Sequence, residues 1–136
     1  MMETLNSILK KTPLKSTPQR LSILNTIQKN GHICVEDIFK ELKPQFPSLS
    51  LATIYKNINL LKEEGILSEI YIQNLKPKYE IKKTPHGHFI CKNCGKIYDF
   101  ELQNVCNPSL KEIEKIEDSE VYLYGICKKC KKRKKD

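Results

Sequence analysis

Two cysteine pairs of identical spacing are the strongest chemical signal in the sequence. Two residues separate Cys91 from Cys94 and Cys127 from Cys130, and 32 residues lie between the pairs. A two-residue spacer lets both thiolates of a pair reach one ion at about 2.3 Å, and two pairs complete a tetrahedron. Thiolates in this geometry select zinc or an iron–sulfur centre. We expect a structural zinc site with no open coordination position, which supports the fold and does no catalysis.

Other uses of the cysteines stay open at this point. A thioredoxin-like redox pair normally opens a helix within a βαβ unit, and neither pair has that context. An iron–sulfur centre uses the same thiolate ligands as zinc. Cys34 and Cys106 stand alone, and we expect both to be small buried residues.

The histidines suggest a second metal site of a different kind. On an extended strand His86 and His88 point to the same side, because strand side chains alternate. Asp99 lies on the strand expected beyond the first cysteine pair. Two imidazoles with carboxylates suit Fe(II), Mn(II), Zn(II) or Co(II). The alternative is an exposed polar strand, and spacing alone does not establish whether His32 and Glu80 join the group.

The first half of the chain reads as helices followed by a hairpin. Thr17 as N-cap and Pro18 begin a helix that Gly31 ends. A second helix is expected at 35–42, and a third runs from Ser50 to Gly65. In the third helix we expect one face to be buried and the opposite face exposed. The buried set is Leu51, Ile54, Ile58 and Leu61, and the exposed set is Thr53, Tyr55, Lys56, Asn57 and Asn59.

Strands at 66–72 and 78–81, joined at 74–77, complete a winged-helix pattern, a variant of the helix-turn-helix. The second half predicts short strands at 88–91, 96–100 and 121–126 and a helix at 108–116. That half is too small to bury much surface alone, so it needs a metal, a partner subunit, or both. The fold class is therefore α+β, with a DNA-binding domain over 1–83, a dimerisation and metal-binding domain over 84–130, and a basic tail over 131–136.

Charge and hydropathy exclude other classes of protein. The chain has 136 residues, of which 39% are hydrophobic and 29% charged, as in globular proteins. No apolar run approaches the ~20 residues of a membrane span. The first residues lack the basic flank and apolar stretch of a secretory signal, so we expect a cytoplasmic protein. Of the net charge of +8, the last nine residues carry +6. We expect most of this excess to lie in a mobile, solvated tail at 131–136, and the alternative is a non-specific attraction for phosphates.

Taken together, these segments resemble the Fur family of metal-dependent bacterial repressors. The segments that carry the resemblance are Thr17-Pro-Gln-Arg20, Ser50-Leu-Ala-Thr-Ile-Tyr-Lys-Asn57, His86-x-His88, Cys91-x-x-Cys94-Gly-Lys-Ile-x-Asp-Phe100 and Gly125-x-Cys127-x-x-Cys130. They follow the family's order over nearly the whole chain. The resemblance implies an N-terminal winged helix, a C-terminal dimerisation domain, and a homodimer on pseudo-palindromic operator DNA.

The resemblance also implies a role for particular residues. It places structural zinc at the four paired cysteines. It places a regulatory Fe(II) or Mn(II) ion at His32, Glu80, His86, His88 and Asp99. Tyr55 and Lys56 match recognition-helix positions that meet DNA, and Lys15 matches a basic residue near the minor groove. We expect Ser50, Thr53 and Asn57 to share the DNA-contacting surface.

The kind of signal depends on Asp99. An aspartate there is similar to the peroxide-sensing PerR branch, whereas the iron-sensing Fur branch usually has glutamate. In PerR-like proteins ferrous iron reacts with hydrogen peroxide and a ligand histidine becomes 2-oxo-histidine; His32 and His86 match the two oxidisable positions. Glu80 stands where PerR proteins often carry aspartate, so an iron-responsive repressor that binds metal reversibly is the alternative.

Two further differences concern the rest of the family pattern. Many members have an additional metal site in the dimerisation domain, but Pro85, Gly87, Cys106 and Ser119 occupy the corresponding positions and cannot build it. We therefore expect no third metal site. The segment between Asp99 and Cys127 is also about four residues short of the family's pattern.

Two other classes of protein fit less well. A zinc hydrolase needs an open zinc position and a general base, so we expect no enzyme. A constitutive DNA-binding zinc module would have no use for the histidine and carboxylate set.

Overall fold

The computed structural model describes residues 4–72, 75–82, 86–101, 111–115 and 119–133. The chain divides into two compact units, Met1–Lys82 and Lys83–Asp136. The sequence placed this boundary after residue 83. None of the described helices is long and apolar enough to cross a membrane.

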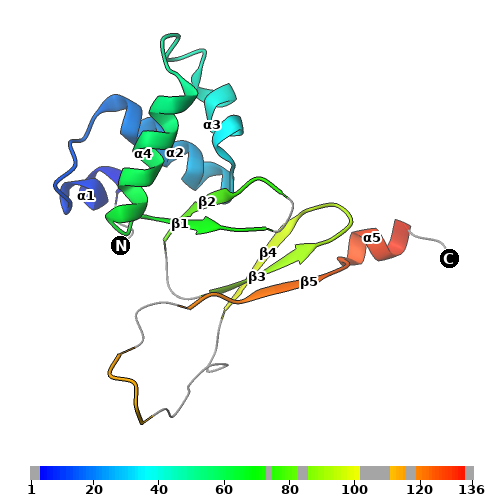
Figure 1. Cartoon of the computed structure of the whole chain (residues 1–136). Helices are drawn as coiled ribbons and strands as arrows, with labels where there is room; N and C mark the ends of the chain where they lie inside the picture. Colours follow the sequence, from blue (N-terminus) through cyan, green and yellow to red (C-terminus); the bar gives the residue numbers. More distant parts are fainter. Residues whose placement is uncertain (1–3, 73–74, 83–85, 102–110, 116–118, 134–136) are drawn as a thin grey trace. The chain divides into compact units, whose positions relative to one another are not determined.

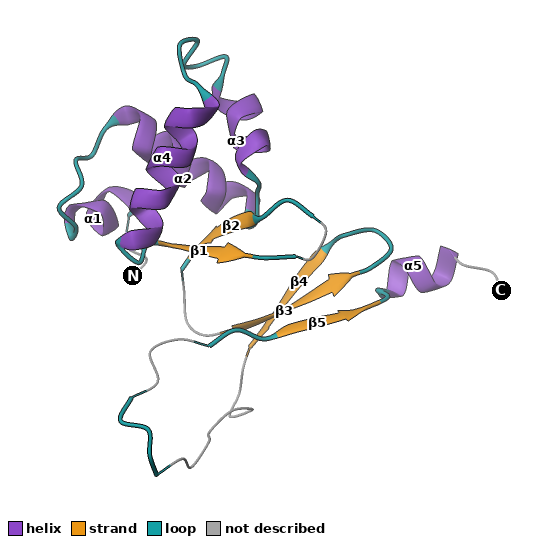
Figure 2. Ribbon diagram, viewed as in Figure 1, coloured by secondary structure: helices purple, strands orange, loops and turns teal. Residues whose placement is uncertain are grey.

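The N-terminal unit is a winged helix, as predicted. It contains four helices followed by an antiparallel pair of strands (Figures 1 and 2). The elements are α1 (Leu5–Lys10), α2 (Pro18–Asn30), α3 (Val35–Leu42), α4 (Leu51–Glu63), β1 (Leu67–Ile70) and β2 (Lys78–Ile81). The side chains of Thr17 and Ser50 accept hydrogen bonds from the first turns of α2 and α4, which confirms both predicted caps. Gly31 ends α2 with a φ of 80°, a conformation that favours glycine.

The core of this unit confirms most of the predicted buried face of α4. Ile54, Ile58 and Leu61 are fully buried. The prediction for Leu51 was wrong, since its side chain is 38% exposed, and the core position at this end of the helix belongs to Leu49. Leu49 and Ile54 occupy the two positions that flank an N-cap in a hydrophobic staple, which explains the exchange.

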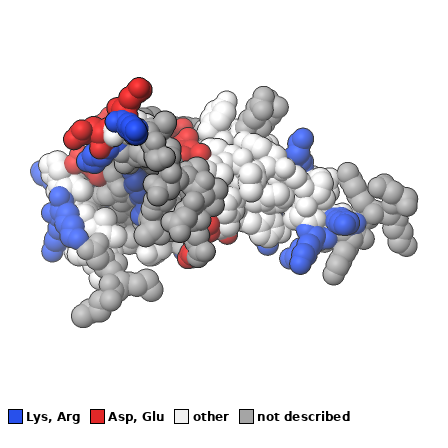
Figure 3. All heavy atoms as spheres, turned by 90° about the horizontal axis from the view of Figure 1, so that it is seen from below, with Lys and Arg blue, Asp and Glu red and all other residues white. Residues whose placement is uncertain are grey.

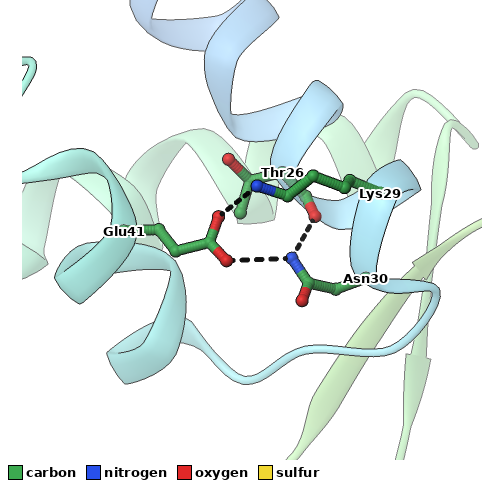
Figure 4. A network of polar contacts seen from close by, with 4 residues as sticks. All are labelled: Thr26, Lys29, Asn30 and Glu41. Atoms are coloured by element: carbon green, nitrogen blue, oxygen red, sulfur yellow. Dashed lines mark hydrogen bonds and ion pairs between the residues drawn. The ribbon is translucent and has the colours of Figure 1, made fainter.

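A polar network joins the end of α2 to α3 (Figure 4). The carboxylate of Glu41 accepts a hydrogen bond from the Asn30 amide at 3.3 Å and lies 3.3 Å from the ammonium of Lys29. The Asn30 amide also donates to the carbonyl of Thr26 at 2.8 Å. These contacts hold the last turn of α2 against α3, directly before the loop that contains His32.

The C-terminal unit is built on a three-stranded sheet with the order β4-β3-β5. Its elements are β3 (His86–Cys91), β4 (Ile97–Glu101), β5 (Tyr122–Gly125) and the helix α5 (Lys128–Arg133). The central strand β3 pairs antiparallel with β4 and parallel with β5. The three predicted strands of this half are confirmed, and with them the α+β fold.

Two predictions for the C-terminal unit were wrong. Residues 111–115 of the expected helix at 108–116 form turns and bends, and its other residues lie outside the described part. Within the described residues 111–115, Ile113 is 45% exposed, so its burial does not offset the cost of starting a helix. The tail expected from residue 131 instead continues α5 to Arg133, where the amide of Lys131 donates to the carbonyl of Cys127. Cationic side chains at a helix C-terminus are favoured by the helix dipole.

Close packing in the sheet requires glycine at position 87. Gly87 lies opposite Phe100 in the β3–β4 register, and a Cβ atom on Gly87 would overlap the Phe100 ring. We predict that Gly87→Ala destabilises the sheet by about 1–3 kcal/mol, as overpacking does. Hydrogen exchange of the β3 amides measures this loss. In the double variant with Phe100→Ala, the total destabilisation should differ clearly from the sum of the two single-variant values, because Phe100→Ala removes the ring that the new Cβ atom overlaps. Simple additivity would contradict the close packing of Gly87 against Phe100.

Candidate metal centres and DNA-binding surface

The four paired cysteines come together in the C-terminal unit. Their sulfur atoms all lie within 4.8 Å of one another. The Sγ atoms of Cys91 and Cys130 are 3.6 Å apart, and those of Cys94 and Cys127 are 3.8 Å apart. A tetrahedral zinc with bonds of about 2.3 Å has sulfur–sulfur edges of about 3.8 Å. The arrangement therefore fits the predicted structural zinc.

Sheet pairing and two tight turns bring these cysteines together. Cys91 is the last residue of β3 and lies opposite Gly125 of β5, two residues before Cys127. Gly95, with a φ of 77°, donates its amide to the carbonyl of Cys91 and turns the chain back after Cys94. Cys130 lies in the first turn of α5. Each cysteine thus lies within a regular element or within three residues of one.

Hydrogen bonds stabilise thiolate forms in this cluster. The amide of Cys94 and the amide of Cys127 donate to Sγ of Cys91, at 3.5 and 3.4 Å, and lower the pKa of Cys91 to about 6. The amide of Cys130 and then the hydroxyl of Tyr98 lower the pKa of Cys127. Because metals bind thiolates and not thiols, these donors favour metal binding by Cys91 and Cys127.

Cys34, one of the two isolated cysteines, is buried as expected. It precedes the first residue of α3, and burial raises the pKa of its thiol above the ordinary value. Cys106 lies outside the described residues.

In the N-terminal unit His32 and Glu80 form a pair. The backbone of Ile33 exchanges two hydrogen bonds with that of Tyr79 on β2, at 2.8 and 3.2 Å. This antiparallel bridge sets the residues on either side opposite each other, so Nε2 of His32 lies 3.6 Å from Oε1 of Glu80. The Glu80 side chain is 4% exposed and that of His32 16%. A buried carboxylate beside an imidazole is a suitable pair of metal donors.

The C-terminal unit contains the other predicted donors. His88 lies opposite Asp99 in the β3–β4 register, and its Nδ1 is 2.8 Å from Oδ1 of Asp99. The ring of His86 packs edge-on against that of His88 with centroids 4.6 Å apart, so both histidines are on one face, as the strand period predicts. The opposite residue to His86 is Glu101. These histidines and Asp99 offer nitrogen and oxygen ligands suited to Fe(II) or Mn(II).

The predicted DNA contacts of α4 are only partly exposed. Tyr55 is 41% exposed, and its hydroxyl donates to Glu36 of α3 at 3.0 Å. Lys56 is exposed and Thr53 half-buried. The Ser50 hydroxyl caps α4 and lies 3.0 Å from that of Thr53. Lys15 lies exposed in the loop before α2.

The expectation that Asn57 lies on the exposed face was wrong. Asn57 is 8% exposed, its amide donates to the carbonyl of Thr53, and its Oδ1 accepts from Arg20 of α2. The Asn57 side chain faces the start of α2, where Arg20 donates to it. Arg20 belongs to the Thr17-Pro-Gln-Arg20 motif, but its contact with Asn57 joins residues 37 positions apart, so no local sequence pattern indicates it.

The C-terminal unit also exposes an apolar strand that the sequence did not single out. Leu123 and Tyr124 of β5 are each 49% exposed, and Ile126 directly after it is 45% exposed. We refer to Leu123, Tyr124 and Ile126 as the β5 surface.

Figure 3 shows a view in which the lysines and arginines form separate groups and not one continuous patch.

Comparisons with known proteins agree with this geometry. The sequence pattern of the ferric uptake regulator family matches residues 11–124. The chain is 33% identical to the peroxide operon regulator of Bacillus subtilis, over 92% of this chain and 90% of the relative. The Campylobacter jejuni peroxide stress regulator has 34% identity and a TM-score of 0.66, covering 95% of this chain and all of the other. The Helicobacter pylori ferric uptake regulator Fur, whose structure is described as having three functional metal-binding sites, has 25% identity and a TM-score of 0.71, covering 93% and 89%.

Loss of one zinc ligand should affect one unit more than the other. We predict that Cys91→Ser abolishes zinc retention and increases hydrogen exchange throughout β3, β4 and β5, because a small sheet loses its crosslink. The helices of the N-terminal unit should keep their protection. Cys34→Ser, a buried cysteine outside the cluster, is the matched control and should retain zinc. Full zinc content in Cys91→Ser would contradict the assignment.

Proposed function

The chain belongs to the ferric uptake regulator family, and from this premise we propose that it is a metal-dependent, DNA-binding transcriptional repressor that senses peroxide. The observation that carries the proposal is the pair of His88 and Asp99, 2.8 Å apart beside His86. In this pair an aspartate contacts an imidazole, and an aspartate at position 99 is the feature that resembles the peroxide-sensing branch. The names of the Bacillus subtilis and Campylobacter jejuni relatives support the same function.

We infer that the donors of the two units hold one regulatory ion, Fe(II) or Mn(II). The N-terminal unit supplies a histidine and a glutamate, and the C-terminal unit supplies two histidines and an aspartate. Neither set alone fills the coordination sphere of such an ion. Glu80 and His86 are six residues apart, so their Cα atoms lie within about 21 Å even in a fully extended chain. The connecting segment therefore allows both sets to reach one ion.

Such an ion would control DNA binding by restricting the angle between the units. The conformer in which more ligands converge binds the ion more tightly, so the ion increases its population. In a dimer, only that conformer would place both α4 helices one DNA turn apart, about 34 Å. Metal binding and operator binding would then rise together.

We propose that the protein binds pseudo-palindromic operator DNA as a homodimer in the cytoplasm. Tyr55, Lys56 and Thr53 of α4 would enter the major groove, the capped start of α4 at Ser50 would approach a phosphate, and Lys15 would reach the minor groove. The β5 surface is the apolar strand that a second copy would cover. We assign the protein no enzymatic reaction, because thiolates fill the zinc centre and the other donors form a binding set.

Peroxide would release the DNA by removing a ligand. Hydrogen peroxide is a two-electron oxidant, and with Fe(II) bound by these donors it would transfer one oxygen atom into an imidazole C–H bond and leave as water. His32 and His86 are the residues we expect to be oxidised. An oxidised imidazole would no longer bind the metal. The population of the conformer in which the ligands converge, and the affinity for operator DNA, would then both fall.

An anaerobic peptide map tests this function. The zinc-loaded protein receives Fe(II) and then peroxide, with a Mn(II)-loaded sample as control. We expect the mass of one oxygen atom on the His32 or His86 peptide, only in the iron sample. Unmodified histidines in the iron sample would contradict peroxide sensing, as would peroxide-induced DNA release retained by a His32→Ala/His86→Ala variant.

One observation favours a second function, an iron-responsive repressor that binds metal reversibly. The carboxylate beside His32 belongs to a glutamate, Glu80, at a position where peroxide sensors often have aspartate. In that case iron would activate DNA binding and chelation would release it, without any change in the protein's mass.

The Asp99→Glu variant distinguishes between these two functions. The longer side chain keeps a carboxylate ligand but changes its distance from His88, so metal-dependent DNA binding should persist while histidine oxidation falls about tenfold or more. Oxidation rates by mass spectrometry and DNA binding by fluorescence anisotropy check this. Asp37→Glu, the same change at an exposed position on α3, should alter neither. Equal oxidation of Asp99→Glu and the parent protein would contradict the role of Asp99.

A further inference from the structure

Arg20 connects the two segments that carry the predicted DNA contacts. Its Nη1 donates to the backbone carbonyl of Lys15 at 3.0 Å, in the loop before α2. Its Nε donates to Oδ1 of Asn57 in α4 at 2.9 Å. The side chain therefore spans from the Lys15 loop to the recognition helix, and both ends are fixed by hydrogen bonds.

Each end of this bridge is itself held by the backbone. The carbonyl of Lys15 also accepts from the amide of Thr17 at 3.0 Å, and the hydroxyl of Thr17 accepts from the amide of Arg20 at 3.2 Å. On α4 the Asn57 amide donates to the carbonyl of Thr53 at 2.9 Å, which fixes its Oδ1 toward Arg20. The contacts form a continuous chain from the cap of α2 to the middle of α4.

We propose that Arg20 is a positioning residue that sets the distance between Lys15 and α4, so that the minor-groove and major-groove contacts form together. The inference rests on the proposed DNA-binding function and extends it. A guanidinium suits this role because its planar fork carries several donors in fixed directions. A lysine keeps the charge but has a single nitrogen and cannot make both contacts in this geometry.

The surroundings of Arg20 favour positioning over a direct contact with DNA. A hollow of about 510 Å³ lies between the start of α2 and α4, and Gln19, Thr53 and Lys56 are among its lining residues. Arg20 lines the same hollow but is only half-exposed, and two of its nitrogens already have acceptors in the protein. Lys56, which is exposed, is better placed to meet a phosphate.

A double-mutant cycle tests the coupling. The DNA is a duplex selected from a random-sequence pool by the Mn(II)-loaded wild-type protein. If Arg20 positions the loop, Lys15→Ala costs about tenfold in affinity in the wild type but less than about threefold in the Arg20→Lys background. Asn57→Ala, which removes the acceptor at the other end, should reduce the Lys15 effect in the same way. The control is Gln28→Ala, at an exposed position on the same helix, in which the Lys15 effect should stay at about tenfold.

Alternative outcomes separate positioning from other roles. If Arg20 is a phosphate contact only, Arg20→Lys retains affinity and its effects add to those of Lys15→Ala, which overturns the proposal. Hydrogen exchange without DNA supplies a second measurement: the amide of Thr17 should exchange at least about tenfold faster in Arg20→Lys, while α4 keeps its protection. Unchanged exchange there overturns the bridge itself. If the wild-type protein selects no duplex, the proposed function fails, and hydrogen exchange still decides whether Arg20 holds the loop.

Discussion

Strand β3 carries predicted ligands of two different metal centres within six residues, and the rest of the C-terminal unit is arranged around its pairing. His86 and His88 lie near one end, on one face, and Cys91 ends the strand. The antiparallel ladder with β4 sets His88 opposite Asp99, and the parallel ladder with β5 sets Cys91 opposite Gly125, close to the second cysteine pair. Zinc at the cysteines would therefore hold the two neighbours of β3 in register, and with them the histidine and aspartate pair. A structural zinc ion would in this way position residues that bind an exchangeable regulatory ion.

The N-terminal unit uses backbone pairing for the same purpose. A single antiparallel bridge between Ile33 and Tyr79 places His32 beside Glu80, and the network of Asn30, Lys29 and Glu41 fixes the helix that leads into that loop. The same unit carries α4, so the predicted metal donors His32 and Glu80 and the predicted DNA contacts belong to one compact unit. This is the physical basis on which an ion bound far from α4 in sequence would influence how α4 meets DNA.

Much of this arrangement could be predicted from the sequence because the signals are local. Caps at Thr17 and Ser50, a two-residue cysteine spacer and the alternation of His86 and His88 each depend on a few neighbouring residues, and each was confirmed. The failures depend on packing between distant segments. Leu51 has an apolar side chain, but Leu49 occupies the core position at that end of α4. Asn57 has a polar side chain, but it is buried and accepts a hydrogen bond from Arg20 of α2. Helical periodicity cannot show which neighbour will cover a given face.

We propose that donors from both units bind one regulatory ion. A Mn(II) titration followed by electron paramagnetic resonance tests this shared binding. Glu80→Gln removes a charged donor from the N-terminal unit, and Asp99→Asn removes one from the C-terminal unit. We expect each change to weaken Mn(II) binding by at least about tenfold while the zinc content stays the same. Unchanged Mn(II) affinity in Glu80→Gln, with a loss in Asp99→Asn, would show that the ion belongs to the C-terminal unit alone and would contradict the account.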